Sequence, residues 1–275
     1  MIMGFFGKLF EKKECAICGG EIGLLGNRKL EDGNMCKDCA SKLSPWFDDR
    51  RNSTIEQINT QLAYREANKE EVAVFKTTRV YGEATKIYLD EDACKFMVTS
   101  ASSPNDITKS NPDVLSFSDV TGCELDINEH KREITRADKD GKQVSYNPPR
   151  YEFQYDFYVL IRVRNPYFDE IRFKLNRDSV DLESQLPQRM ASTGVGRFMS
   201  GATQSINPEY SVEYRQYKQM GEEIKAALIQ VRQESRDAAA AAAAPKTVVT
   251  CPYCGATTTP DASGRCEYCG GAVTD

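Results

Sequence analysis

Eight of the chain's ten cysteines fall in four Cys-x-x-Cys pairs, and this pattern constrains the fold more than any other feature. Two pairs lie near the start of the chain and two near its end. The two-residue gap lets both sulfurs of a pair reach one ion from a tight turn, and two such turns complete a tetrahedron around Zn²⁺. We therefore predict two structural Zn²⁺ ions, one held by Cys15, Cys18, Cys36 and Cys39 and the other by Cys251, Cys254, Cys266 and Cys269.

The size of the two modules also favours a bound metal. Each spans at most 25 residues, too few to bury a stable core without a staple. Structural zinc supplies roughly 10–16 kcal/mol of apparent binding energy in small finger peptides. A single pair would be equally compatible with buried thiols or a redox dithiol, and iron in a four-sulfur site remains compatible with the geometry. Four thiolates complete the zinc shell, so we expect no open position for water or substrate.

Glycine follows three of the four pairs, at Gly19, Gly255 and Gly270, where the turn benefits from a residue that tolerates positive φ. Ala40 is the exception. Between the pairs of each module lie a strand-like segment and a turn signal, Asp32-Gly33 in the first module. We call the tight turn that carries one cysteine pair a knuckle. Both modules are predicted to have the order knuckle, strand, turn, knuckle, which is the order of a zinc ribbon.

The stretch Cys15-Ala-Ile-Cys18-Gly-Gly-Glu-Ile-Gly, with Cys36-Lys-Asp-Cys39 downstream, resembles a bacterial zinc-ribbon domain family of unknown function over residues 14–70. The resemblance implies a bacterial source and zinc at those cysteines, and it indicates no particular activity for this chain. The segment Cys251-Pro-Tyr-Cys254-Gly is similar to generic short ribbons that end many bacterial proteins.

Between the modules, residues 153–163 give the clearest strand signal, because apolar side chains occupy every odd position and return at Ile171, Phe173 and Leu175. Directly opposed residues share a face, so paired numbers must have an even sum. A three-residue loop at 165–167 then predicts a hairpin with the pairs Ile161–Ile171, Val159–Phe173 and Arg162–Glu170. Shorter strands are expected at 72–80, 85–90, 94–99, 114–117 and 120–128, turns or loops at 90–92 and 103–106, and a turn followed by a loop at 138–150.

These signals predict an α+β fold that is mainly antiparallel β, a barrel or sandwich flanked by two small zinc ribbons. In pattern, the middle region resembles a bacterial pleckstrin-homology-like domain, which implies a bent barrel closed by a C-terminal helix. We expect a zinc ribbon at 14–52, a linking helix at 53–71 capped by Ser53 with Glu56 in a capping box, and the β domain at 72–180. A flexible linker at 181–206, a helix and alanine-rich spacer at 207–244, and a second zinc ribbon at 250–275 follow.

The expected C-terminal helix begins after Asn207, with Pro208 in its first turn. Its apolar stripe implies packing on the β domain or on a second copy of itself. The stripe consists of Tyr217, Met220, Ile224, Ala227, Leu228 and Val231.

Charge and motifs argue against several classes of function. The net charge is −5 and neither cysteine module is basic, which argues against nucleic-acid binding. The one histidine, His130, lies in a charged run typical of a solvated loop or strand end. Cys94 and Cys123 are interpreted as small buried apolar residues in strands. No catalytic triad, P-loop or dinucleotide motif is present, so we predict neither an enzyme nor a small-molecule substrate.

We therefore hypothesise a cytoplasmic, non-enzymatic adaptor or scaffold that acts through protein–protein interaction, because paired cysteines without an export signal indicate a reducing compartment. One alternative is a peripheral membrane-surface protein, anchored through the apolar segment 1–13 by Phe5, Phe6, Leu9 and Phe10. The other is a nucleic-acid-associated zinc-ribbon protein. No apolar run approaches the roughly 18 residues that a membrane span needs.

Overall fold

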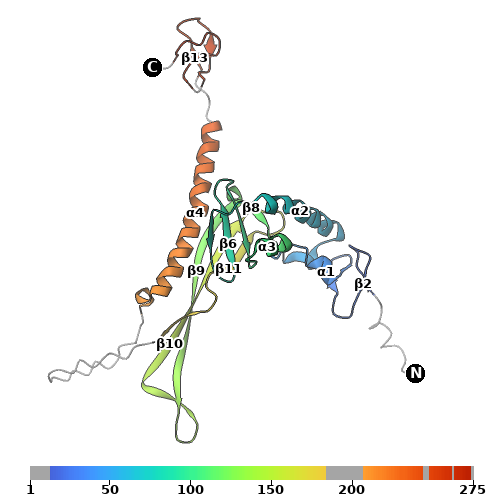
Figure 1. Ribbon diagram of the computed structural model, residues 1–275, viewed down its shortest axis with the longest axis vertical. Helices are drawn as coiled ribbons and strands as arrows, with labels where there is room; N and C mark the ends of the chain where they lie inside the picture. The colour runs from blue at the N-terminus through green and yellow to red at the C-terminus, as the bar shows by residue number, and fades with distance from the viewer. Residues whose placement is uncertain (1–12, 184–206, 244–247, 262, 274–275) are drawn as a thin grey trace, which may run out of the picture. The chain divides into compact units, whose positions relative to one another are not determined.

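The structure is a computed structural model that describes residues 13–183, 207–243, 248–261 and 263–273 (Figure 1). The chain divides into two compact units, Met1–Arg232 and Gln233–Asp275. The apolar residues Phe5, Phe6, Leu9 and Phe10 and most of the predicted linker, 184–206, lie outside the described residues.

The first unit begins with a small module around the first four cysteines. It contains the antiparallel pair β1 (Lys13–Glu14) and β2 (Glu21–Ile22), the hairpin β3 (Arg28–Lys29) and β4 (Asn34–Met35), the short helix α1 (Lys37–Ala40) and the 3₁₀ turn η2 (Asp49–Asn52). Its core holds Leu30 and Met35, both fully buried, together with Ile58 from the following helix. The module is therefore completed by a helix that lies outside it in sequence.

That helix, α2 (Ile55–Val74), has Thr54 as its N-cap, one residue later than the predicted cap Ser53. The capping box is formed by Thr54 and Gln57: the Gln57 N–H donates to Thr54 Oγ1 at 3.3 Å, and Gln57 Oε1 accepts from the Thr54 N–H at 2.8 Å. Ser53 instead ends η2, and its carbonyl accepts from the Glu31 N–H. The strand predicted at 72–80 is wrong for 72–78, because α2 continues through Val74 and buries Val72, and the next strand begins only at Arg79.

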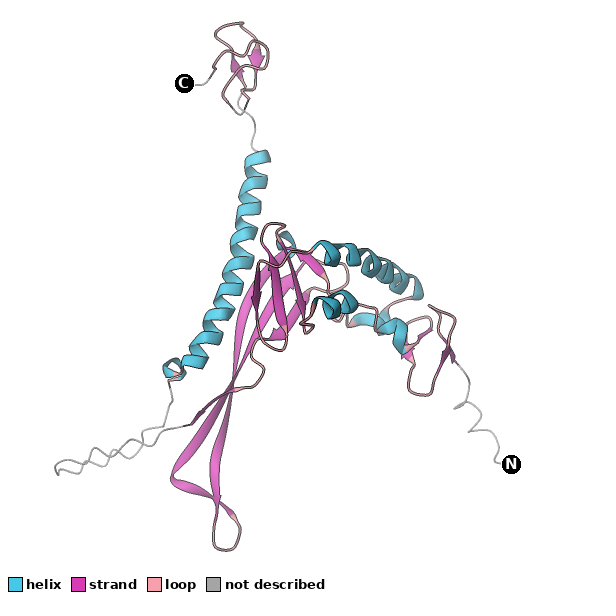
Figure 2. Ribbon diagram, viewed as in Figure 1, coloured by secondary structure: helices cyan, strands magenta, loops and turns pink. Residues whose placement is uncertain are grey.

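The first sheet is antiparallel, in the order β5 (Arg79–Tyr81), β6 (Lys86–Asp90), β7 (Lys95–Thr99) and β8 (Val114–Ser116). The strands of the chain are drawn in magenta in Figure 2. The predicted turn at 90–92 joins β6 to β7. The loop expected at 103–106 is instead the start of helix α3 (Pro104–Ser110), where Ser103 accepts from the Asp106 N–H and Pro104 occupies the first turn. The 3₁₀ turn η3 (Phe117–Asp119) leads into the second sheet.

The second sheet is built on β10 (Gln143–Val163), which pairs on one side with β9 (Val120–Ala137) and on the other with β11 (Glu170–Lys174) and β12 (Val180–Glu183). The predicted register is confirmed, with Ile161 opposite Ile171, Val159 opposite Phe173 and Arg162 opposite Glu170. Residues 181–183, which were expected to begin the linker, belong to β12.

Strands β9 and β10 form a long hairpin that projects beyond the rest of the sheet (Figure 1). The turn predicted at Asp140-Gly141 is present, with Gly141 at φ +77°. The loop predicted to follow is wrong, because β10 already begins at Gln143. The ladder passes from Ser145–Thr135 to Arg150–Ile134, so residues 146–149 have no opposite residue on β9. Pro148 and Pro149 therefore lie where no ladder hydrogen bond is needed.

The main core lies between the two sheets and the last helix. It includes Phe96 and Phe117 beside the first sheet, Phe157 and Ile161 on β10, and side chains of α4 (Val212–Ala243). In the described residues the two sheets do not close into a barrel, although the Glu83 N–H donates to the Leu175 carbonyl at 3.0 Å between them. The fold is thus mixed α and β with mainly antiparallel sheets.

Helix α4 packs on the β domain, which is the first of the two arrangements that its apolar stripe predicts. It follows the 3₁₀ turn η4 (Pro208–Tyr210), for which Asn207 accepts from the Glu209 N–H. Tyr214, Tyr217, Ile224 and Leu228 are buried in the main core. None of the helices in the described residues has the length and hydropathy that crossing a membrane requires.

The second unit contains β13 (Val249–Thr250) and β14 (Thr257–Thr258), which pair antiparallel, and an isolated bridge between Arg265 and Ala272. Among the residues of this unit whose burial the structure describes, Cys251, Cys266 and Thr258 are buried. So small a core cannot hold the module together without an added link.

The contact between α4 and β9 gives a test of this packing. A Cβ added at Gly221 would lie 2.4 Å from Leu125 Cδ1 and 3.1 Å from its Cγ. Gly221→Ala should therefore destabilise the protein by about 1–2 kcal/mol in denaturant titrations followed by Trp46 fluorescence, whereas alanine in a free helix would stabilise by about 1 kcal/mol. In a Leu125→Ala background the sign should reverse. A stabilising effect of Gly221→Ala alone would show that α4 does not pack here.

Candidate metal centres

The four cysteines predicted at the first site lie together. Their Sγ atoms are all within 4.8 Å of one another, and the Sγ atoms of Cys18 and Cys36 are 3.8 Å apart. Sulfurs at the corners of a tetrahedron with Zn–S bonds of about 2.3 Å are about 3.8 Å apart. Cys15 and Cys39 are buried and Cys18 is exposed. The cluster is thus compatible with one structural zinc ion.

The four cysteines at the second site form an equivalent cluster, also within 4.8 Å of one another. Cys251 Sγ lies 3.5 Å from Cys269 Sγ, and Cys254 Sγ lies 3.8 Å from Cys266 Sγ. Again two of the cysteines, Cys251 and Cys266, are buried and the other two are exposed. This cluster is compatible with a second structural zinc ion.

Three of the four cysteine pairs adopt the same knuckle. In each, the first cysteine's carbonyl accepts from the N–H of the glycine four residues later, at 2.8–2.9 Å, and its N–H donates to the carbonyl of the residue after that glycine. Gly19, Gly255 and Gly270 all have φ +70°, which a residue with a side chain adopts only with strain. The glycines that follow these pairs are therefore required by the turn.

The fourth pair, Cys36–Cys39, is different and explains Ala40. Cys36 is the N-cap of α1, and its Sγ accepts from the Cys39 N–H at 3.3 Å. The Ala40 N–H donates to the Cys36 carbonyl as in a continuing helix, so no positive φ is needed. The prediction of a second knuckle is thus wrong for the first module, which runs knuckle, hairpin, helix.

Backbone N–H groups favour thiolates in both clusters. Burial alone would raise the pKa of Cys15, but hydrogen bonds from the N–H groups of Cys36, at 3.2 Å, and of Cys18 lower that pKa to about 6. Burial would also raise the pKa of Cys251, but hydrogen bonds from the backbone N–H groups of Cys254 and Tyr253 lower that pKa to about 7. Burial and neighbouring sulfurs raise the pKa of Cys39. A divalent cation supplies the charge that several adjacent thiolates need.

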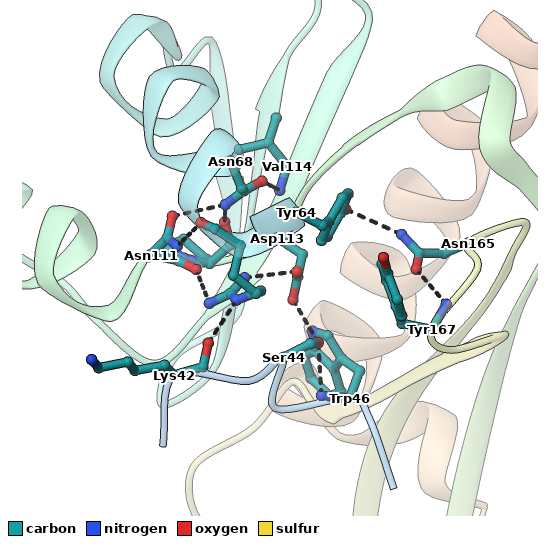
Figure 3. Close-up of polar contacts among 12 residues, drawn as sticks. Lys42, Ser44, Trp46, Tyr64, Asn68, Asn111, Asp113, Val114, Asn165 and Tyr167 are labelled. Carbon is teal, nitrogen blue, oxygen red and sulfur yellow. Dashed lines mark hydrogen bonds and ion pairs between the residues drawn. The ribbon is translucent and has the colours of Figure 1, made fainter. Parts of the chain in front are cut away.

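A buried ion pair lies beside the first cluster, where the module meets the β domain (Figure 3). Arg65 on α2 donates to Asp113 Oδ1 at 2.7 Å, with side chains 5 % and 0 % exposed. Ser44, which follows α1, donates to Asp113 Oδ2 at 2.7 Å, and the Arg65 Nε–H donates to the Lys42 carbonyl at 3.2 Å. Residues from three separate segments therefore share one pair of charges.

Two asparagines complete this polar joint, the set of contacts centred on Arg65 and Asp113 (Figure 3). Asn68 donates to Asn111 Oδ1 and to the Pro112 carbonyl, and accepts from the Val114 N–H, all at 2.7–2.9 Å. Asn111 ends α3 with φ +47° and donates to the Arg65 carbonyl at 2.7 Å. The side chains of Arg65, Asn68, Asn111 and Asp113 thus all have hydrogen-bond partners, as burial requires.

The sequence did not lead us to this joint. The buried face of α2 runs Ile58, Gln61, Arg65, Asn68 and Val72, and three of these five are polar. Their helical spacing was the available signal, but polar residues at such positions usually face solvent. Burial raises the pKa of Asp113, and the opposing effects of Arg65 and Ser44 only partly offset this rise.

The remaining candidate residues do not join the clusters. Cys123 is buried on β9, as predicted, and burial raises its pKa to about 12. Cys94 is half-buried and ends the turn before β7 with φ +54°, not within a strand. His130 is exposed, as predicted, but it lies in the middle of β9, opposite Gln154, and not in a loop or at a strand end.

These features define a protein with two four-cysteine clusters compatible with two structural zinc ions. A family model described as Domain of unknown function (DUF4428) matches residues 13–61, which contain the first cluster and the start of α2. No curated protein and no solved structure matches the chain.

Metal content tests the clusters directly. Purified protein should carry two zinc ions per chain by elemental analysis, matching the two clusters. Cys36→Ser and Cys266→Ser should each lower the content to one, because three thiolates no longer close the shell. Cys94→Ser is the matched control and should retain two. Loss of metal in the control, or none in Cys36→Ser, would contradict the assignment.

The polar joint predicts non-additive effects. Arg65→Met leaves the Asp113 carboxylate buried without its cation and should destabilise the first unit by about 3–5 kcal/mol in denaturant titrations. Adding Asp113→Asn removes the unpaired charge and should recover part of this loss. If the two changes were simply additive, the pair would not act as a unit.

Proposed function

We propose that this chain is a non-enzymatic, zinc-binding adaptor or scaffold that acts through protein–protein interaction, with the C-terminal module as a docking element. Four thiolates around zinc leave no position for a substrate, so each cluster holds a surface in shape and performs no chemistry. Under this proposal the N-terminal module and the C-terminal module are zinc ribbons in the broad sense, one of them ending in a helix.

The pair of exposed tyrosines on the C-terminal module carries this proposal. Tyr253 and Tyr268 occupy the same position in two identical knuckles and are each 73 % exposed. A Cβ added at Gly271 would lie 2.6 Å from Tyr253 Cδ2, so that ring rests against the second knuckle's backbone. Tyrosines held on a rigid frame lose little entropy on binding and are enriched in protein interfaces.

The first unit would serve as the body of the adaptor. Two antiparallel sheets followed by a packed helix, α4, are compatible with the pleckstrin-homology-like arrangement that the sequence pattern suggests. We propose a cytoplasmic location, in keeping with ten cysteines that form no disulfide.

The two alternatives make different demands. A nucleic-acid-associated protein should be retained on heparin or DNA and released as salt rises; the net charge of −5 favours no retention. A membrane protein anchored through residues 1–13 should float with liposomes and lose this on deletion of that segment.

Tyrosine variants test the adaptor proposal without disturbing the metal. Tagged full-length protein, its Tyr253→Ser/Tyr268→Ser variant and Cys251→Ser should be compared by affinity purification from native cells. We expect the same binding proteins to be lost from both variants, with zinc content unchanged in the tyrosine variant. Tyr210→Ser is the matched control, because Tyr210 is also exposed, at 83 %, but precedes α4. Identical binding proteins for all four would overturn the proposal.

A further inference from the structure

Two adjacent leucines are held in water at the tip of a tight turn in the first module. The Gly26 N–H donates to the Gly23 carbonyl at 2.9 Å, which closes a β-turn with Leu24 and Leu25 at its two central positions. These side chains are 87 % and 91 % exposed, more than any other large apolar side chain in the described residues. Neither contributes to the core of the module.

Four cations, Arg28, Lys29, Arg50 and Arg51, line a surface hollow that begins next to this turn. Arg28 donates from Nη1 to the carbonyls of Leu25 and Asn27, both at 3.3 Å, so its charge lies directly beside the leucines. Arg50 donates to the Lys29 carbonyl, and Arg51 lines the surface hollow together with Arg28, Lys29 and Arg50. The hollow contains one carboxylate, Glu31, and in the described part of the chain none of the four cations forms an ion pair.

The cations are also close enough to oppose one another. Burial, and then the charges of Arg51 and Arg28, lower the pKa of Arg50. Arg28 and Arg50 are both tied to backbone carbonyls of this module, so they cannot simply swing apart. Such a cluster is relieved by an external anion.

We propose that the turn 23–26 and its border of Arg28, Lys29, Arg50 and Arg51 form a docking surface for an anionic lipid bilayer. Leu24 and Leu25 enter the apolar boundary of the bilayer, and the four cations contact its phosphate and carboxylate headgroups. A free phosphate would use the cations alone, and an uncharged apolar groove would use the leucines alone. A bilayer with acidic headgroups uses both at once, because its charged and apolar layers lie a few ångströms apart.

This site differs from the docking element of the proposed function, which lies on the other unit, and from the segment 1–13. Lys13 pairs with Ile22, so the chain before Lys13 joins the module next to the turn. Any lipid binding by that apolar segment must therefore be separated from binding by the turn, and the experiment needs both backgrounds.

The test is co-sedimentation of zinc-loaded protein with phosphatidylcholine vesicles that contain or lack phosphatidylserine. Full-length protein and a version lacking residues 1–12 should both bind the vesicles that contain phosphatidylserine more strongly than the vesicles that lack it. Leu24→Ser/Leu25→Ser should weaken this binding by about tenfold or more in either background. Lys29→Gln/Arg51→Gln should weaken it by about tenfold, and added salt should have a similar effect.

Matched controls keep the outcome clear. Val74 is 67 % exposed at the end of α2, and Val74→Ser should bind vesicles as the unchanged protein does. Lys139→Gln/Lys142→Gln removes two charges from the tip of the β9–β10 hairpin and should have a much smaller effect than Lys29→Gln/Arg51→Gln. Zinc content confirms that each variant is folded around its metal. Equal binding by the leucine variant, equal binding to both vesicle types, or binding that depends only on residues 1–12 would overturn the proposal.

Discussion

The arrangement of the first unit depends on one buried ion pair, Arg65 with Asp113. Removing two charges from water is costly, and the cost is offset only if every remaining polar group finds a partner. Here Ser44 donates to Asp113, Asn68 donates to the Pro112 carbonyl and Asn111 donates to the Arg65 carbonyl. Because these residues come from the end of the cysteine module, from α2 and from the segment between α3 and β8, the same contacts that satisfy the charges fix the three segments together (Figure 3).

In the first unit the zinc cluster is connected to this polar joint, whereas the second unit contains a zinc cluster and no part of the joint. The first cluster includes Cys39 in α1, and the chain that leaves α1 brings Ser44 to Asp113. A metal that orders the cluster therefore also orders one side of the joint, as expected when metal binding and folding are coupled. The C-terminal cluster forms within its own unit, so its metal stabilises that module alone. Two clusters with the same kind of ligands thus differ in how much of the chain their metal helps to order.

Sequence reasoning succeeded where a pattern had one physical solution. Period-two alternation fixed the pairing of Val159 with Phe173, because a slip by one residue would expose the whole apolar set. It failed after the turn at Asp140-Gly141, where a loop was predicted up to residue 150, because nothing local shows that a ladder can skip residues 146–149 and continue. Cysteine spacing located both clusters. The joint was missed because Arg65 gains its buried role only from Asp113, 48 positions away.

The difference between the two modules can be traced to Ala40. Glycine after a pair allows positive φ and turns the chain back, as at Gly19, Gly255 and Gly270. Alanine after the Cys36–Cys39 pair favours a continuing helix, and α1 runs through Ala40 with Ser41 as its C-cap. The chain is then carried past the metal centre to Lys42 and Ser44, whose carbonyl and hydroxyl meet Arg65 and Asp113. A second knuckle would return the chain toward its own hairpin, so the helical form of this one pair is what allows the first metal centre to be built into the larger unit.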